Sequence, residues 1–354
     1  MSIMSATDKN PASRPHDDTS EAPAAAVLDP AGFFRRIPLL PHQLASRRTA
    51  TSDVIVLCHL GVPRITTDAW RLTIDGLVER PTIIDYGRLL SFPKVFVETV
   101  HQCAGSPLQP EVAARRISNV VWTGARLADV LALAQPQSAA RLVWGYGADY
   151  GAFDNVPCDT YLKDFPLSRL NEDVLIAYEL NGADLPPEHG YPARLVIPGF
   201  YGTNSVKWLT RLTLATERAD SPFTTRWYND PELDETGRPT GARRPVWSIA
   251  PESVIVSPAP DAQVTAGTIC AVTGWAWADG GVDRLDISCD AGVRWHAATL
   301  EKPTGRAWQG FRYDWTPTAA GPVTLMARAH GRRGGVQPQN SRRNAIHCVP
   351  ITVV

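Results

Sequence analysis

The sequence lacks an excess of charge of either sign and lacks any long hydrophobic run. Its 354 residues carry 35 Lys and Arg against 36 Asp and Glu, a formal net charge of −1. This balance creates no long-range field toward nucleic acid or an anionic membrane surface, so we expect neither partner. No segment reaches the roughly 18 apolar residues of a membrane-spanning helix.

The N-terminus has no charged start followed by an apolar core, so we see no export signal and expect a cytoplasmic location. Arg35 and Arg36 form a twin-arginine pair that leaves a periplasmic location open. The segment that follows them, IPLLPHQLASRR, is too short and too polar for an export signal.

Cysteine is sparse and scattered. The sequence has no CxxC pair, no CxxCH haem-attachment motif and no short zinc-type spacing, which indicates reduced thiols rather than a disulfide framework or a zinc site. The six cysteines are Cys58, Cys103, Cys158, Cys270, Cys289 and Cys348.

The composition divides the chain into three parts. Residues 1–30 are rich in Ala, Pro, Ser and Asp, which predicts a disordered tail. Residues 31–250 alternate strand-like runs, such as 70–78 and 193–200, with the helical stretch 125–134, and these predict a mixed α+β domain. Within it, residues 221–251 are polar and rich in Pro, Gly and Arg, which indicates a long connection with a local function.

Residues 251–354 have a different pattern. Short runs rich in β-branched and aromatic residues recur at strand-and-turn spacing, about seven strands in roughly 100 residues, which predicts an immunoglobulin-like sandwich. The predicted runs are 268–277, 282–289, 293–300, 308–315, 322–330 and 345–354.

One cysteine stands in a distinctive place. Cys103 directly follows a strand-like run and directly precedes a small-residue turn, in ETVHQCAGSP at 98–107. Ala104 and Gly105 would let a bulky ligand approach the backbone. A thiolate at such a turn suits a soft metal or a nucleophile, although a buried structural cysteine is the commoner case. From these residues alone, metal ligand, nucleophile and core filling all remain open.

The surrounding blocks narrow the choice. In order they are HLGVP (59–63), WRLTIDGLVERP (70–81), VHQCAG (100–105), VVWTGARLADVL (120–131) and LIAYELNGADLPPEHGYPARLVIPGFYGTNSVKWL (175–209), followed by the β-rich region. This series resembles the sulfite oxidase family of molybdopterin enzymes from about residue 53 to the C-terminus. The resemblance implies that Cys103 is the single protein ligand of molybdenum.

The resemblance also implies the other site residues. His189, Arg194 and Lys207 match positions that bind the pterin and its terminal phosphate, and His59 matches a histidine near the cofactor. Tyr228 matches an active-site tyrosine that hydrogen-bonds near the metal. Arg194 and Lys207 could instead be surface charges at strand ends, and Tyr228 an ordinary interface aromatic. The family implies oxygen-atom transfer, a homodimer formed by the C-terminal domain and a separate electron acceptor, such as a cytochrome.

The sequence departs from the family where substrate is bound. Leu57-Cys58-His59 stands where the family has Arg-Asn-His, and Ser106-Pro107-Leu108 stands where an Asn and arginines are expected. Two substrate-binding cations are therefore missing. Arg342 or Arg343 is a candidate replacement from the C-terminal domain.

Three functions follow from these observations. The first is a molybdenum oxidoreductase that oxidises sulfite to sulfate or acts on a related small substrate. The second is a molybdopterin-binding dimer that is non-catalytic or has another specificity, such as an S- or N-oxide reductase. The third is a thiol hydrolase or transferase that uses Cys103 with His101 or His59.

Overall fold

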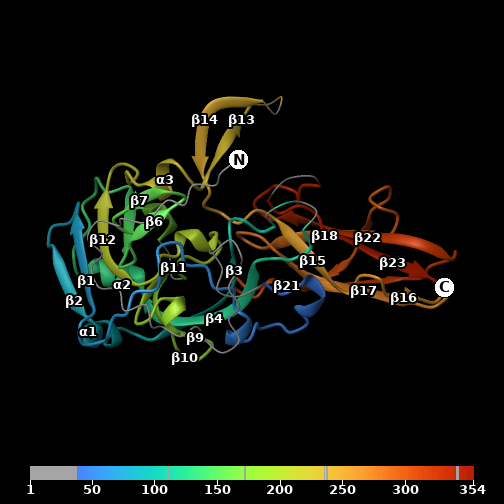
Figure 1. Ribbon diagram of the computed structural model, residues 1–354, viewed down its shortest axis with the longest axis horizontal. Coiled ribbons are helices and arrows are strands. Elements are labelled where there is room, and N and C mark those ends of the chain that lie inside the picture. The colour runs from blue at the N-terminus through green and yellow to red at the C-terminus, as the bar shows by residue number, and fades with distance from the viewer. Residues whose placement is uncertain are drawn as a thin grey trace, which may run out of the picture.

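The computed structural model describes residues 38–354, apart from 108, 110, 111, 171, 172, 235, 237 and 340–342. The predicted disordered tail lies outside the described residues. The predicted class, a mixed α+β unit followed by an all-β sandwich, is confirmed, and the two parts lie at opposite ends of an elongated molecule (Figure 1). Helices are few and short: α1 (Tyr86–Leu90), α2 (Leu127–Ala132) and α3 (Pro222–Thr225).

The N-terminal part contains a five-stranded sheet. Its order is β2 (Thr82–Asp85), β1 (Arg71–Gly76), β12 (Leu209–Ala215), β5 (Leu142–Gly147) and β8 (Leu162–Pro166). β1 and β12 are parallel, with Thr73 opposite Arg211, and the other neighbours are antiparallel. Leu72 and Ile74 alternate with more exposed residues along β1, as expected of a strand with one buried face.

A second sheet supports the segment that carries Cys103. Its order is β10 (Ala183–Asp184), β9 (Leu175–Leu180), β4 (Ile117–Arg126) and β3 (Val95–Gln102), and β11 (Arg194–Val196) also pairs with β9. The predicted helix over 125–134 is α2, which begins directly after β4 and buries Leu127, Val130 and Leu131. These positions follow the i, i+3, i+4 spacing of one helix face.

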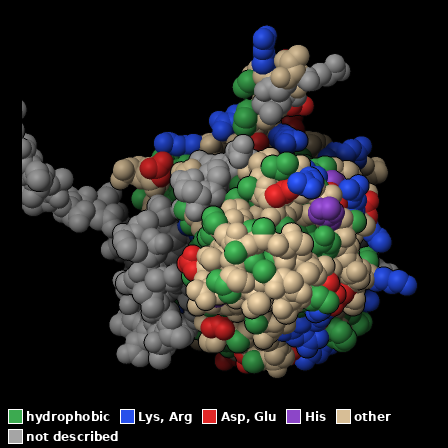
Figure 2. All heavy atoms as spheres, turned by 90° about the vertical axis from the view of Figure 1, so that its right-hand side faces the viewer, with side chains coloured by type: hydrophobic (Ala, Val, Ile, Leu, Met, Phe, Trp, Pro, Cys, Tyr) green, Lys and Arg blue, Asp and Glu red, His purple; other side chains and the backbone are tan. Residues whose placement is uncertain are grey.

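The C-terminal part is the predicted two-sheet sandwich. One sheet has the order β15 (Glu252–Ser257), β17 (Cys270–Trp277), β21 (Gln309–Trp315) and β20 (Thr299–Leu300). The other has the order β16 (Gln263–Val264), β23 (Cys348–Val353), β22 (Gly321–Gly331), β18 (Val282–Ser288) and β19 (His296–Ala297). Buried aliphatic residues of both sheets form the core between them. On the end of the sandwich that faces the viewer in Figure 2, apolar side chains are scattered rather than gathered in one patch.

Two features differ from the sequence prediction. The predicted strand over 293–300 is two short strands, β19 and β20, because the chain crosses there from one sheet to the other. Most of the predicted connection over 221–251 is ordered: after α3 it forms the hairpin β13 (Asn229–Leu233) and β14 (Pro239–Pro245), which stands out from the body in Figures 1 and 2. A small hairpin, β6 (Gly151–Phe153) and β7 (Val156–Cys158), lies near α3.

Buried charges join the two parts. Asp279, only 7% exposed, accepts hydrogen bonds from Arg169 of the N-terminal part and from Arg306 and Arg333 of the sandwich. Arg115 and Glu252, both fully buried, form a second ion pair between the parts. Among the described helices, none is long and apolar enough to cross a membrane.

Candidate active site

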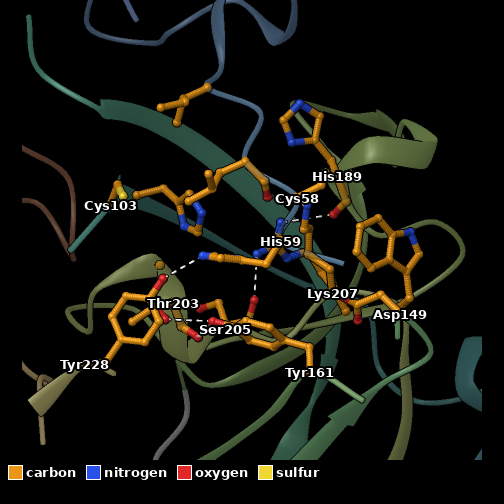
Figure 3. A pocket seen from close by; sticks show the side chains of 16 residues that line it. Cys58, His59, Cys103, Asp149, Tyr161, His189, Thr203, Ser205, Lys207 and Tyr228 are labelled. Carbon is orange, nitrogen blue, oxygen red and sulfur yellow. Dashed lines mark hydrogen bonds between the residues drawn. The ribbon is translucent and has the colours of Figure 1, made fainter. Parts of the chain in front are cut away.

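A pocket opens in the N-terminal part, and all six residues predicted from the sequence line it. They are His59, Cys103, His189, Arg194, Lys207 and Tyr228. Figure 3 shows Cys103 at one side of this pocket and His189, Lys207 and Asp149 at the opposite side, with Tyr161 and Tyr228 along a third edge. The pocket is therefore long enough to separate a group at Cys103 from a group at Lys207.

Cys103 follows the last residue of β3. Its backbone N–H donates to the carbonyl of Arg116 at 2.9 Å, and its Sγ accepts from the N–H of Gly105 at 3.4 Å. Burial raises the pKa of the Cys103 thiol, against weaker opposing effects of Gly105, Arg116 and Arg343. A raised pKa is the opposite of what a thiol nucleophile requires, whereas coordination to a metal deprotonates a thiol outright.

The two predicted phosphate-binding cations lie in the pocket wall, so the surface-charge interpretation is wrong for Arg194. Its guanidinium, 2% exposed, donates to the carbonyls of His189 at 3.0 Å and Ser205 at 2.9 Å. Burial lowers the pKa of Arg194 to about 9. Lys207 Nζ donates to the carbonyls of Leu57 and Glu188, both at 2.8 Å. No carboxylate forms an ion pair with either cation among the described residues.

Gly190 allows these two cations to approach each other. It follows the short 3-10 helix η4 (Pro187–His189) with a φ of 107°, in the left-handed region that favours glycine. A Cβ at this position would lie 3.1 Å from the Cβ atoms of both Arg194 and Lys207. The HGYPAR block thus brings His189 and both cations to one side of the pocket.

Tyr228 and His59 form a hydrogen-bonded pair in the wall. The hydroxyl of Tyr228 lies 2.7 Å from Nε2 of His59. Burial, followed by the charges of Lys207 and Lys163, lowers the pKa of His59 to about 3, so the imidazole is neutral near pH 7. Burial raises the pKa of Tyr228, so its phenol keeps its proton. Tyr228 also has a φ of 57°, a conformation that costs a non-glycine residue on the order of 1 kcal/mol, and the hairpin β13–β14 begins directly after it.

Several lining residues were not predicted as site residues. Asp149 is 4% exposed, and one of its carboxylate oxygens has no hydrogen-bond partner among the described residues; burial, opposed by Lys207, raises its pKa to about 7. Tyr161 hydrogen-bonds Thr203 Oγ1 at 2.7 Å. His101, named in the sequence only as a partner for a thiol nucleophile, lines the pocket, and burial lowers its pKa to about 3.

Two arginines lie beside the Cys103 turn. Neither comes from the two segments in which the arginines expected for the family are missing, and those two segments carry no charge. Arg343 donates from Nε to the carbonyl of Ala104 at 2.7 Å and forms an ion pair with Asp230 at the base of the hairpin. Arg116 donates to the carbonyl of Gly105. Of the two candidates for a replacement charge, Arg343 reaches the turn, and Arg342 lies outside the described residues.

Comparison with known proteins shows which family shares this sequence and fold. Residues 59–223 match a family model described as oxidoreductase molybdopterin binding domain, and residues 243–349 match one described as Mo-co oxidoreductase dimerisation domain. A sulfite oxidase of Gallus gallus is 31% identical over 329 residues, covering 85% of this chain and 70% of the relative. The chain belongs to the sulfite oxidase family.

Other members of the sulfite oxidase family are similar over different lengths. The mitochondrial sulfite oxidase of Homo sapiens is 31% identical over 91% of this chain, and the chain spans 63% of that relative's length. The sulfane dehydrogenase SoxCD of Paracoccus pantotrophus has a solved structure with a TM-score of 0.74 and 27% identity, over 98% of this chain and 92% of that chain.

The pocket fits the molybdenum cofactor of the sulfite oxidase family. No group of three or more His, Cys, Asp or Glu side chains suited to a metal occurs in the described part of the chain. Cys103 offers one soft thiol. At the opposite side, Arg194 and Lys207 provide positive charge for an anionic group such as a phosphate.

Proposed function

We propose that this protein is a molybdenum-dependent oxidoreductase that transfers an oxygen atom, with sulfite as the first candidate substrate. The observation that carries the proposal is that Cys103 shares one pocket with Arg194 and Lys207, which form no ion pair within the described residues. Residues 31–250 would hold the cofactor, and residues 251–354 would form a homodimer.

Each predicted residue has a role in this proposal. Cys103 would bind the metal, and His59, His189, Arg194 and Lys207 would bind the pterin and its phosphate. Asp149 adds a buried acceptor for N–H groups of the pterin. The bound cofactor supplies oxygen-atom transfer and accepts two electrons.

Tyr228 acts as a donor near the reaction centre. Its protonated phenol, whose oxygen lies 2.7 Å from Nε2 of the neutral His59, would donate a hydrogen bond to substrate held beside Cys103. Sulfite oxidation consumes water and releases two protons and two electrons with sulfate. Those electrons would pass to a separate acceptor, such as a cytochrome.

The substrate site determines which anion is oxidised. Arg343 and Arg116 offer positive charge beside the turn at Cys103, where sulfite would approach, and each charge-assisted hydrogen bond contributes roughly 1.5–3 kcal/mol. A second candidate is oxidation of sulfane sulfur. The similarity to the sulfane dehydrogenase over 98% of this chain favours it, together with the uncharged Leu57 and Cys58.

The test combines composition with activity. We expect about one molybdenum and one pterin per chain in protein made by a cofactor-competent host, and loss of molybdenum in Cys103→Ser. Sulfite and a persulfide should be compared as reductants of the metal, with ferricyanide as acceptor, followed by a panel of S- and N-oxides as oxidants. Absence of molybdenum from the wild type would overturn the proposal. Molybdenum with both sulfur reductants inert would exclude both candidate substrates.

A further inference from the structure

We propose that Glu252, on the first strand of the C-terminal sandwich, is a positioning residue for Cys103. This inference rests on the proposed role of Cys103 in binding the metal. Glu252 does not line the pocket and touches no reacting atom. Its carboxylate instead holds both ends of the loop that carries Cys103.

The first end of the loop is held through Gln102. This residue is fully buried and immediately precedes Cys103. Its side-chain amide N–H₂ donates to Glu252, and its amide oxygen accepts from Nε1 of Trp277 at 2.8 Å. Both partners belong to the sandwich, so groups outside the N-terminal part also hold the residue that precedes Cys103.

The second end of the loop is held through Arg115. Its Nε lies 3.1 Å from the Glu252 carboxylate, and both side chains are fully buried. The next residue, Arg116, returns to the turn: its carbonyl accepts from the N–H of Cys103, and its N–H donates to Ser106 Oγ at 2.9 Å. One carboxylate thus fixes residues 102 and 115, which bracket the turn.

The same ion pair reaches the segment that carries Arg343. Arg115 donates from a terminal nitrogen to the carbonyl of Ala345 at 3.1 Å. Asn344, which lies between Arg343 and Ala345, donates from its backbone N–H to the carbonyl of Ser106, and its side-chain oxygen accepts a hydrogen bond from the hydroxyl of Tyr201. A displaced Arg115 would therefore move the metal-binding turn and its neighbouring cation together.

Stability alone does not explain a buried ion pair, because apolar residues of similar volume often stabilise a core equally well. Arg115 also donates hydrogen bonds to the carbonyls of Val112, Ala113 and Ala345, and these directional bonds fix its orientation in a way that apolar packing cannot. Glu252 also uses its second oxygen, on Gln102, for a residue adjacent to Cys103. This arrangement favours positioning over stabilisation.

The experiment compares Glu252→Gln with Asp286→Asn. Asp286 is an equally buried carboxylate of the sandwich, bound by Arg284, Arg328 and His330, and it makes no hydrogen bond to the loop. In the cofactor-free full-length chain, iodoacetamide labelling of each cysteine is followed by peptide mass spectrometry. Cys58, a pocket thiol outside the loop, is the internal reference.

We expect Glu252→Gln to raise the labelling rate of Cys103 relative to Cys58 at least fivefold, and Asp286→Asn to leave the ratio unchanged. In the loaded enzyme, Glu252→Gln should also shift the electron paramagnetic resonance signal of the one-electron-reduced metal. Glu252→Gln with a lower Tm but with an unchanged ratio and signal would show a purely stabilising role and overturn the inference.

Gln102→Leu tests the same link if Glu252→Gln does not fold. This variant keeps the Arg115–Glu252 pair, and we expect a smaller rise of the same ratio; an unchanged ratio would overturn the inference. The labelling requires no metal, so it separates the two proposals. A raised ratio in a protein that never binds molybdenum would contradict the proposed function alone, and bound molybdenum with an unchanged ratio would contradict the positioning role alone.

Discussion

The burial of Arg194 predicts that removing its charge changes the stability of the cofactor-free protein little but lowers the stability of the cofactor-bound protein. Burial lowers the pKa of Arg194 from 12.5 to about 9, because the charged form loses its hydration in the pocket wall. One pKa unit corresponds to about 1.4 kcal/mol, so the charge destabilises the cofactor-free fold by on the order of 5 kcal/mol at neutral pH. Because the folded pKa lies below the unfolded one, this penalty is fully present below pH 9 and is relieved as pH rises toward 12.5.

Arg194→Met removes that penalty and two charge-assisted hydrogen bonds to carbonyls, each contributing roughly 1.5–3 kcal/mol. The net change in the cofactor-free protein should therefore lie within about 2 kcal/mol of zero. With an anionic cofactor bound, the wild-type charge gains a partner that the variant lacks. The variant should then be less stable than wild type by about 2–3 kcal/mol, and it should retain less pterin.

The measurement is denaturant unfolding of both proteins, with and without cofactor, together with pterin content. Arg211→Met is the matched control, since this arginine lies on β12, the next strand in sequence, is paired with Asp75 and stays half-exposed. It should change both states equally and by less than about 1 kcal/mol. Loss of more than about 3 kcal/mol in the cofactor-free Arg194→Met protein would refute the reasoning, because the charge would then be compensated within the protein.

Three further predictions concern single contacts. Tyr228→Phe removes the donor to His59 and should lower kcat on the order of 100-fold with a smaller effect on KM in steady-state assays; a change in KM alone would contradict its role as a donor. Arg343→Met should raise KM for an anionic substrate about tenfold and weaken its salt dependence, and an unchanged KM would place substrate elsewhere. Burial raises the pKa of Asp286, but hydrogen bonds from Arg284, His330 and Arg328 outweigh it and hold the pKa below 3.8. The contribution of ionised Asp286 to the free energy of unfolding is present above about pH 3.9 and is lost as pH falls through the lower folded pKa. Unfolding curves of wild type and Asp286→Asn should therefore differ at pH 7 and converge in acid. A difference that stays the same at every pH would contradict this role of Asp286.

Pocket residues that stand in contiguous sequence blocks could be predicted from the sequence. Cys103 stands in one such block, and His189, Arg194 and Lys207 stand in another. The structure brings all of them to one pocket. Short runs rich in β-branched and aromatic residues, recurring at strand-and-turn spacing over residues 251–354, likewise predicted a sandwich.

The other features of the site and the fold could not be predicted from the sequence, because they depend on contacts between distant segments. Asp149 lies in a short loop after β5 with no motif around it, and only the fold places it beside Lys207. Arg343 could not be chosen over Arg342 without the turn at Ala104. The hairpin β13–β14 was missed because its polar, proline-containing strands lack the alternation that marks a strand with a buried face, and a hairpin that stands away from the body needs none.

The parallel pairing of β1 with β12 has a consequence for biosynthesis. Thr73 pairs with Arg211, which lies 138 residues later in the chain (211 − 73), so this pairing cannot form until Arg211 has been synthesised. At about 5–20 residues per second, this delay is on the order of 10 s. The pocket, with lining residues from Ile55 to Tyr228, cannot exist on the ribosome before then. Cofactor loading must follow the translation of nearly two-thirds of the chain, and β1 needs protection from wrong strand partners until that point.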